Sequence, residues 1–254
     1  MKKSYANCSL CPLYEKPIVI GESSHNELDK IRLLVLAEAP SKEEVKNNKP
    51  LCGPAGKIFR QAFNKLKLNQ IPHIITNVCL CANLDKNNKN SNPPLEALEC
   101  CKINWQTLIK NLPNLELILI MGSMPMKVFD IAESGILKLR GKFYTYNNIN
   151  VMLTIHPSYI LRNGGIGSES YNLFESDLKL IKENLNKPVL RNNVNVSKSE
   201  DVNIESARGI NENYLYYFTL PSEYYKEEYC LFDVQYLRNK HTILYIFLDK
   251  NGNK

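Results

Sequence analysis

Cysteines at short spacings are the first residues in this sequence whose types suggest chemistry. The 254-residue chain contains eight cysteines. Six of them form three short groups, Cys8-x-x-Cys11, Cys79-x-Cys81 and Cys100-Cys101. Thiolates at such spacings are typical ligands of a metal ion or an iron–sulfur cluster. One pair cannot complete a coordination shell, so the groups would have to meet in the fold. Buried cysteines without a ligand are the alternative.

Disulfide bonds are not the expected use of these cysteines. The N-terminal residues 1–8 lack the apolar core of a signal peptide. No apolar run approaches the roughly 20 residues that a membrane-spanning helix requires. We therefore expect a cytoplasmic protein with no membrane partner, in a compartment that keeps thiols reduced.

Polar residues at the ends of apolar runs form a second group of candidates. Four runs have the length of buried strands, at residues 33–37, 72–78, 115–122 and 150–155. The polar residues at or just after their ends are Glu38, Asn77, Ser123 and His156. In an open α/β sheet, ligands bind beyond the carboxyl ends of the parallel strands. Each residue alone also has a structural explanation, but four such placements together predict a site.

The elements that must position these residues alternate along the chain. Helices are expected between and after the strands, at residues 53–67, 95–112, 124–132 and 169–186, while residues 39–50 and 81–92 are expected to be loops. Residues 138–143 are expected to form a turn that leads into an edge segment. Alternating strands and helices predict an α/β fold with three layers, α/β/α, around a central four-stranded parallel sheet.

The C-terminal part of the chain differs in character from the rest. Residues 192–211 are polar and read as a linker, and strands are expected at 214–220, 230–236 and 241–248, the last two as a hairpin. We therefore expect one domain at 1–186 and a linker with a small β appendage at 187–254. The net charge of +6 and the sequence pI near 8.8 are compatible with a phosphate-rich partner.

Several motifs together resemble a known enzyme family. They occur in order as Ala37-Glu-Ala-Pro40, Pro50-x-x-Gly53-x-Ala-Gly56, Thr76-Asn-Val78, Met121-Gly122, Leu139-Arg-Gly141 and His156-Pro-Ser-Tyr-x-Leu-Arg-Asn163. This order is similar to that of uracil-DNA glycosylases, above all the cluster-bearing family 4. The resemblance covers residues 5–186 and leaves the β appendage unexplained.

The resemblance implies a cofactor and its ligands. Family 4 enzymes hold a [4Fe–4S] cluster with one Cys-x-x-Cys pair and two later cysteines. Matched to this chain, the ligands would be Cys8, Cys11, Cys81 and Cys101. Either neighbour, Cys79 or Cys100, could replace one of them, and zinc is the alternative to the cluster. The cofactor would have a structural role, holding the N-terminal segment against a DNA-facing loop.

The resemblance also implies a DNA substrate and roles for the strand-end residues. Glu38 would act on the attacking water and the developing sugar cation, and His156 would hydrogen-bond the leaving base. Asn77 would read the base edge, and Asn90 matches a further active-site asparagine. Ala39 and Leu51 would contact the base.

Residues expected to contact DNA follow from the same comparison. Leu161 and Arg162 stand where the family inserts a wedge into the duplex. The residues expected to meet phosphates are Lys42, Lys57, Lys142 and Arg162. We expect the protein to act as a monomer on single- or double-stranded DNA.

Departures from the family pattern leave more than one target base compatible with the sequence. Leu51 occupies the place of an aromatic residue that stacks on uracil, and Ser41 replaces a glycine. A flat stacking surface contributes about 1–3 kcal/mol per base. The sequence predicts a glycosylase for uracil or a modified base. One alternative is an enzyme for a bulkier modified base, for example in antiviral defence, and another is a non-catalytic DNA-binding module of the same fold.

Overall fold

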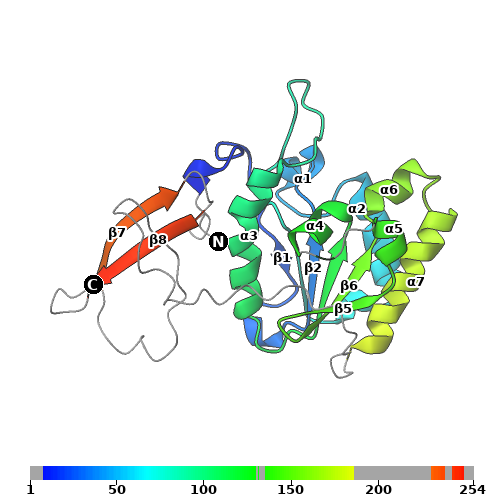
Figure 1. The fold of residues 1–254 in the computed structure, drawn as a ribbon. Helices are drawn as coiled ribbons and strands as arrows, with labels where there is room; N and C mark the ends of the chain where they lie inside the picture. Colours follow the sequence, from blue (N-terminus) through cyan, green and yellow to red (C-terminus); the bar gives the residue numbers. More distant parts are fainter. Residues whose placement is uncertain (1–7, 130, 132–134, 186–229, 238–241, 249–254) are drawn as a thin grey trace. The chain divides into compact units, whose positions relative to one another are not determined.

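The chain forms two compact units, Met1–Lys198 and Ser199–Lys254, which we describe separately. The computed structural model describes residues 8–129, 131, 135–185, 230–237 and 242–248 (Figure 1). Among these residues, none of the helices has both the length and the apolar character needed to span a membrane.

A six-stranded mixed sheet forms the centre of the first unit, with the order β1-β3-β2-β4-β6-β5. Its strands are β1 (Glu22–Ser23), β2 (Leu33–Ala37), β3 (His73–Asn77), β4 (Leu117–Met121), β5 (Phe143–Tyr146) and β6 (Ile149–Thr154). The parallel strands β3, β2, β4 and β6 are the four that the sequence predicts. The predicted strand count was nevertheless wrong, because β1 and β5 extend the sheet with antiparallel pairs at its two edges. β1 has only two residues, too few to produce an alternating pattern.

Helices cover both faces of this sheet (Figure 1). They are α1 (Lys42–Asn47), α2 (Pro54–Lys65), α3 (Leu95–Lys110), α4 (Ser123–Val128), α5 (Ile136–Leu139), α6 (Pro157–Arg162) and α7 (Glu169–Asn184). Alternate residues of β2 face opposite sides: Leu34 and Leu36 pack with α3 and α4, whereas Leu33 and Val35 pack with α2, α6 and α7. The three-layer prediction is confirmed.

Two helices next to the predicted site were missed. Residues 39–50, predicted as a loop, contain α1, which begins with a capping box between Ser41 and Glu44. The spacing Ser-x-x-Glu is a sequence signal for such a start. The α6 helix follows β6 directly, with His156 as its N-cap. Both helices have six residues and show little apolar periodicity, which explains why the pattern did not reveal them.

The Leu139-Arg-Gly141 motif has a structural explanation. Arg140 Nε donates to Asp177 Oδ2 at 2.9 Å, and Thr154 Oγ1 donates to the same oxygen at 2.6 Å. The Asp177 carboxylate is fully buried, so its charge needs these partners. Gly141 has φ +69°, and a Cβ there would lie 2.8 Å from Asp177 Oδ1. The motif therefore fastens the chain before β5 to α7 and β6.

The second unit contains one described hairpin. β7 (Cys230–Leu237) pairs antiparallel with β8 (Thr242–Leu248), with an irregular register between Leu231 and Asp233. This confirms the hairpin that the sequence predicts. The predicted linker at 192–211 and strand at 214–220 lie outside the described residues, and the division of the chain at residue 186 stays a prediction.

Candidate active site

A cavity of about 830 Å³ lies beyond the carboxyl ends of the parallel strands. Its wall includes the four polar strand-end residues Glu38, Asn77, Ser123 and His156. The other predicted site residues that line it are Ala39, Lys42, Leu51, Asn90, Leu161 and Arg162. Lys57 and Lys142 are exposed and do not line the cavity. The fold thus brings most of the predicted base and DNA contacts into one place.

Glu38 follows β2 at the cavity wall and is partly buried. Its backbone carbonyl accepts a hydrogen bond from Cys79 N at 3.0 Å, which ties the end of β2 to the segment after β3. Burial raises the pKa of the Glu38 carboxyl, and the positive charge of Arg162 opposes that shift. A carboxylate in such a position can orient water or stabilise a nearby cation.

His156 caps the N-terminus of α6 through its ring. Its Nδ1 accepts a hydrogen bond from Ser158 N at 3.1 Å and lies 2.8 Å from Ser158 Oγ. Burial, reinforced by the charge of Arg162, lowers the pKa of His156 to about 4. The ring is therefore neutral near pH 7, and because Nδ1 accepts a hydrogen bond, Nε2 carries the proton. His156 is a neutral hydrogen-bond donor at the cavity wall.

The backbone at the end of β4 makes room for this imidazole. Gly122 has φ +97°, and a Cβ at this position would lie 3.1 Å from His156 Cβ. Gly122 N also donates to Thr154 O at 2.9 Å, which joins the ends of β4 and β6. A larger residue than glycine at position 122 would displace the histidine.

Asn77 closes β3 and is only 2% exposed. Its Nδ2 is buried and has no hydrogen-bond partner among the described residues. Leaving a buried donor unpaired costs about 1–3 kcal/mol. Because Asn77 lines the cavity, this amide is suited to a ligand that presents an acceptor oxygen.

Asn90 belongs to an ordered turn at the cavity rim. Leu84 and Asn90 form an antiparallel bridge, and Asp85 Oδ1 accepts from Asn87 N and Lys89 N at 2.8 Å each. The Asn90 side-chain oxygen accepts from Lys42 N at 2.8 Å. This contact joins the turn to the start of α1. The side-chain oxygen of Asn90 thus makes a hydrogen bond that stabilises the fold. A catalytic role for Asn90 stays a prediction.

Six cysteines approach one another where the N-terminal segment meets α3 and the segment after β3. Cys101 influences both Cys100 and Cys79, and the Cys79 thiol donates to the backbone carbonyl of Cys81. The Cys100 thiol interacts with Cys11 and is influenced by Cys8 and Cys101. Burial and these neighbours raise the pKa of Cys100 to about 11. Cys79 and Cys101 form a hydrogen-bonded pair, which raises the pKa of Cys79 and lowers that of Cys101.

The choice between a cluster and a single zinc ion stays a prediction. Within the described ranges, no three His, Cys, Asp or Glu side chains converge closely enough to hold one metal ion. Cys11, Cys101 and Cys8 all act on the Cys100 thiol, so Cys100 lies close enough to the pair Cys8 and Cys11 to be an alternative to the predicted Cys101.

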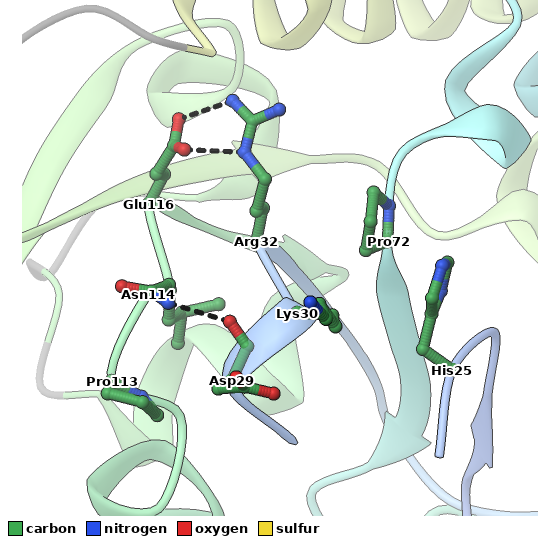
Figure 2. Close-up of a pocket in the computed structure, with 9 residues that line it drawn as sticks. His25, Asp29, Lys30, Arg32, Pro72, Pro113, Asn114 and Glu116 are labelled. Carbon is green, nitrogen blue, oxygen red and sulfur yellow. Dashed lines mark hydrogen bonds and ion pairs between the residues drawn. The ribbon is translucent and has the colours of Figure 1, made fainter. Parts of the chain in front are cut away.

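A second hollow, of about 610 Å³, lies at the amino ends of β2, β3 and β4, and Figure 2 shows residues that line it. Arg32 and Glu116 form an ion pair with two hydrogen bonds here. Arg32 Nε donates to Glu116 Oε1 at 2.5 Å, and Arg32 Nη2 donates to Glu116 Oε2 at 3.0 Å. Asn114 Nδ2 donates to the Asp29 carbonyl at 2.7 Å. These polar groups already bind one another, so this surface is a weaker candidate for catalysis than the cavity at the carboxyl ends of the strands.

Sequence reasoning missed several residues that shape the cavity. Ser158 orients His156, and Glu44 and Arg60 hold the backbone at Leu51. The spacing Ser41-x-x-Glu44 is a capping signal from which Glu44 could have been found. No local pattern could reveal Arg60, because its contacts are with the segment nine and ten residues before it and with Glu22.

Comparisons with known proteins identify the family of this chain. A Type-4 uracil-DNA glycosylase of Saccharolobus solfataricus is 29% identical over 73% of this chain and 86% of its own length. Type-4 uracil-DNA glycosylases of Pyrobaculum aerophilum and Thermotoga maritima are 27% and 29% identical, over 68% and 61% of this chain and 87% and 79% of their own lengths. Residues 25–179 match the profile of the family described as the Uracil DNA glycosylase superfamily. The chain therefore belongs to the uracil DNA glycosylase superfamily.

Proposed function

We propose that this protein is a DNA glycosylase that hydrolyses the N-glycosidic bond of uracil in DNA and leaves an abasic site. The observation that carries the proposal is the convergence of Glu38, Asn77 and His156 on one cavity. A carboxylate, an unpaired amide donor and a neutral imidazole donor are the groups that this reaction needs. The named activity of the relatives supports the same reaction.

Base recognition would depend on Asn77. A target base must leave the stack before its glycosidic bond can be reached. The edge of uracil presents carbonyl oxygens and a ring N–H, which match the donor and acceptor of an asparagine amide. Binding of a carbonyl oxygen to Asn77 Nδ2 would satisfy the donor that lacks a partner in the described part of the chain. The energy of that hydrogen bond then contributes to selection of the base.

Bond cleavage would depend on Glu38 and His156. Departure of the base leaves positive charge on the sugar and negative charge on the base oxygens. The Glu38 carboxylate stabilises the sugar cation and orients the attacking water, while His156 Nε2–H donates to a base oxygen. The Arg162 charge acts on both groups, because it opposes the rise in the Glu38 pKa and adds to the lowering of the His156 pKa that burial causes.

DNA would approach from the α6 side of the cavity. Leu161 is 48% exposed, and Arg162 is exposed beside it at the end of α6. An exposed apolar side chain next to a cation suits insertion into a base stack with a phosphate nearby. Lys42 lines the same rim, whereas Lys57 and Lys142 would serve as more distant phosphate contacts.

The chain also carries residues suited to a [4Fe–4S] cluster. We propose Cys8, Cys11, Cys81 and Cys100 as its ligands, with Cys100 in place of Cys101. When bound, the cluster supplies a structural cross-link between segments that are distant in sequence. Cys79 and Cys101 would then remain as a buried, hydrogen-bonded pair of thiols.

A panel of oligonucleotides tests the proposal. Purified protein is incubated with DNA containing uracil, a modified cytosine or only normal bases, and abasic sites are then cleaved with alkali. Cleavage of the uracil strand, strongly reduced in Glu38→Gln and His156→Ala and retained in Glu183→Gln, is the expected result. Cleavage of modified cytosine alone would reassign the substrate. No cleavage with any base, together with tight DNA binding, would identify a non-catalytic module.

A further inference from the structure

Leu51 has an unusual backbone conformation in the wall of the cavity. Its φ is +49°, in the left-handed region, and its side chain is only 3% exposed. A bulky residue rarely adopts this conformation, and the surrounding structure must compensate for a cost of about 1–3 kcal/mol. The strain therefore occurs at a position that contacts the proposed base site.

Two charged side chains hold the Leu51 backbone from both sides. Glu44 Oε1 accepts the hydrogen bond from Leu51 N. Arg60 Nε donates to Leu51 O at 2.8 Å, and Arg60 Nη2 donates to Pro50 O at 2.8 Å. Arg60 is in turn paired with Glu22. Both polar groups of the Leu51 main chain are thus engaged by side chains from α1 and α2.

The start of α2 packs closely against the backbone of Leu51. A Cβ at Gly56 would lie 2.1 Å from the Leu51 carbonyl carbon. The start of α2 therefore packs directly on the strained residue. Only glycine at position 56 permits that approach.

Glu44 also connects Leu51 to the loop that carries Glu38. Its Oε2 accepts from Ser41 N at 2.6 Å, three residues after Glu38. The Glu44 side chain is 6% exposed, and burial raises its pKa while the hydrogen bonds and Arg60 oppose that shift. A buried carboxylate is costly unless such partners are present. One carboxylate thus joins two sections of the cavity wall.

We infer that Glu44 is a positioning residue that sets the shape of the base pocket by holding Leu51 in its left-handed conformation. It acts through the backbone of Leu51, whose N–H donates to the Glu44 carboxylate. The inference rests on the proposed function for its kinetic consequence, but its structural part is independent of any activity. Loss of Glu44 should weaken binding of the target base and leave the chemical step nearly unchanged.

A double-mutant cycle between Glu44→Gln and Leu51→Gly tests the inference. Glu44→Gln alone is expected to raise KM for uracil DNA about tenfold, as loss of one hydrogen bond to a charged group would, with kcat changed less than about twofold. It also lowers the urea midpoint of unfolding. In the Leu51→Gly background both effects should largely disappear, because glycine adopts positive φ without the strain that Glu44 offsets.

Controls separate this outcome from general damage. Glu183→Gln removes an exposed carboxylate on α7 and should change neither KM nor the urea midpoint. Additive effects of Glu44→Gln and Leu51→Gly on the urea midpoint would overturn the inference, as would a fall in kcat with KM unchanged. If Glu44→Gln is insoluble, solubility of the double variant supports the inference, and insolubility of both contradicts it. The urea measurements stand even if the protein cleaves no DNA.

Discussion

Ser158 N donates a hydrogen bond to Nδ1 of His156 across 3.1 Å, within the first turn of α6. A backbone amide is always a donor, so the ring nitrogen that meets it must be an acceptor. The proton of the neutral imidazole is consequently on Nε2. This contact determines which form of His156 the cavity presents to a ligand.

The first prediction concerns the pH dependence of stability. The folded-state pKa of His156 is lowered to about 4, whereas an unfolded histidine titrates near 6.5. The unfolded chain therefore takes up a proton first as the pH falls from about 6.5 to 4, and stability is lost in that window. Urea unfolding at pH 7 and pH 4.5 should show a smaller loss for His156→Gln than for the unsubstituted protein. An equal loss in both would contradict the lowered pKa, and His25→Gln, at an exposed site, is the control.

Glu38 should determine the acid limb of activity. Burial raises the pKa of Glu38, so its carboxylate becomes protonated at a higher pH than an ordinary glutamate, whose pKa is about 4.3. The activity that depends on the carboxylate should therefore fall as the pH is lowered. Glu38→Gln should reduce kcat by roughly 10²- to 10⁴-fold. The residual activity should lack this acid limb. A pH–rate profile that is identical in the two proteins would exclude Glu38 from the reaction.

Asn77→Leu should separate stability from activity. Leucine removes the buried Nδ2 donor that has no partner in the described structure, so the free energy of unfolding should stay equal or rise. The kcat/KM for uracil DNA should fall by roughly 10²-fold or more, since the base loses its hydrogen-bonding partner. Urea unfolding and single-turnover kinetics on the same preparation check both parts. A variant that is destabilised and fully active would show a purely structural asparagine.

Leu51→Phe tests whether the cavity wall limits uracil binding. An aromatic ring at this position offers a flat surface for the base, worth about 1–3 kcal/mol. KM for uracil DNA should fall by up to about tenfold. Leu95→Phe makes the same change at an exposed position on α3 and should have no effect. Two results would favour a pocket shaped for a larger substrate. One is a raised KM of Leu51→Phe for uracil DNA, and the other is activity on a bulkier base in the unsubstituted protein that Leu51→Phe lacks.

The adjacent cysteines predict different effects on iron binding. Cys100→Ala should lower the iron and sulfide content of the purified protein strongly, because Cys100 contacts Cys11. Cys101→Ala should retain most of the iron and lose stability through its missing contact with Cys79. Cys52 lies outside the group of six cysteines, and its thiol donates to Glu43 O. Cys52→Ala is therefore the control and should keep its iron. The reverse result would support Cys101 as the ligand. An iron-free preparation with full stability would contradict the prediction of a cluster.

The parallel core was predictable because its strands are buried on both faces. Such strands appear as uninterrupted apolar runs, and β2 was predicted at its observed bounds, Leu33–Ala37. The edge strand β1 and the helices α1 and α6 were not predicted. They are short, and their stability comes from neighbours and caps, which leave little periodic pattern in the sequence.

Residue types at the strand ends determined where the site lies. Parallel strands direct their carboxyl ends to one edge, so Glu38, Asn77 and His156 meet once the strands are recognised. The tertiary structure alone decided the state of each group: the proton on His156 Nε2, the unpaired donor of Asn77, the strained backbone of Leu51 and the partner of each adjacent cysteine. These properties depend on burial and on contacts that the fold creates, such as Cys11 with Cys100. A sequence specifies which groups are available, whereas packing sets their charge, their hydrogen bonds and their geometry.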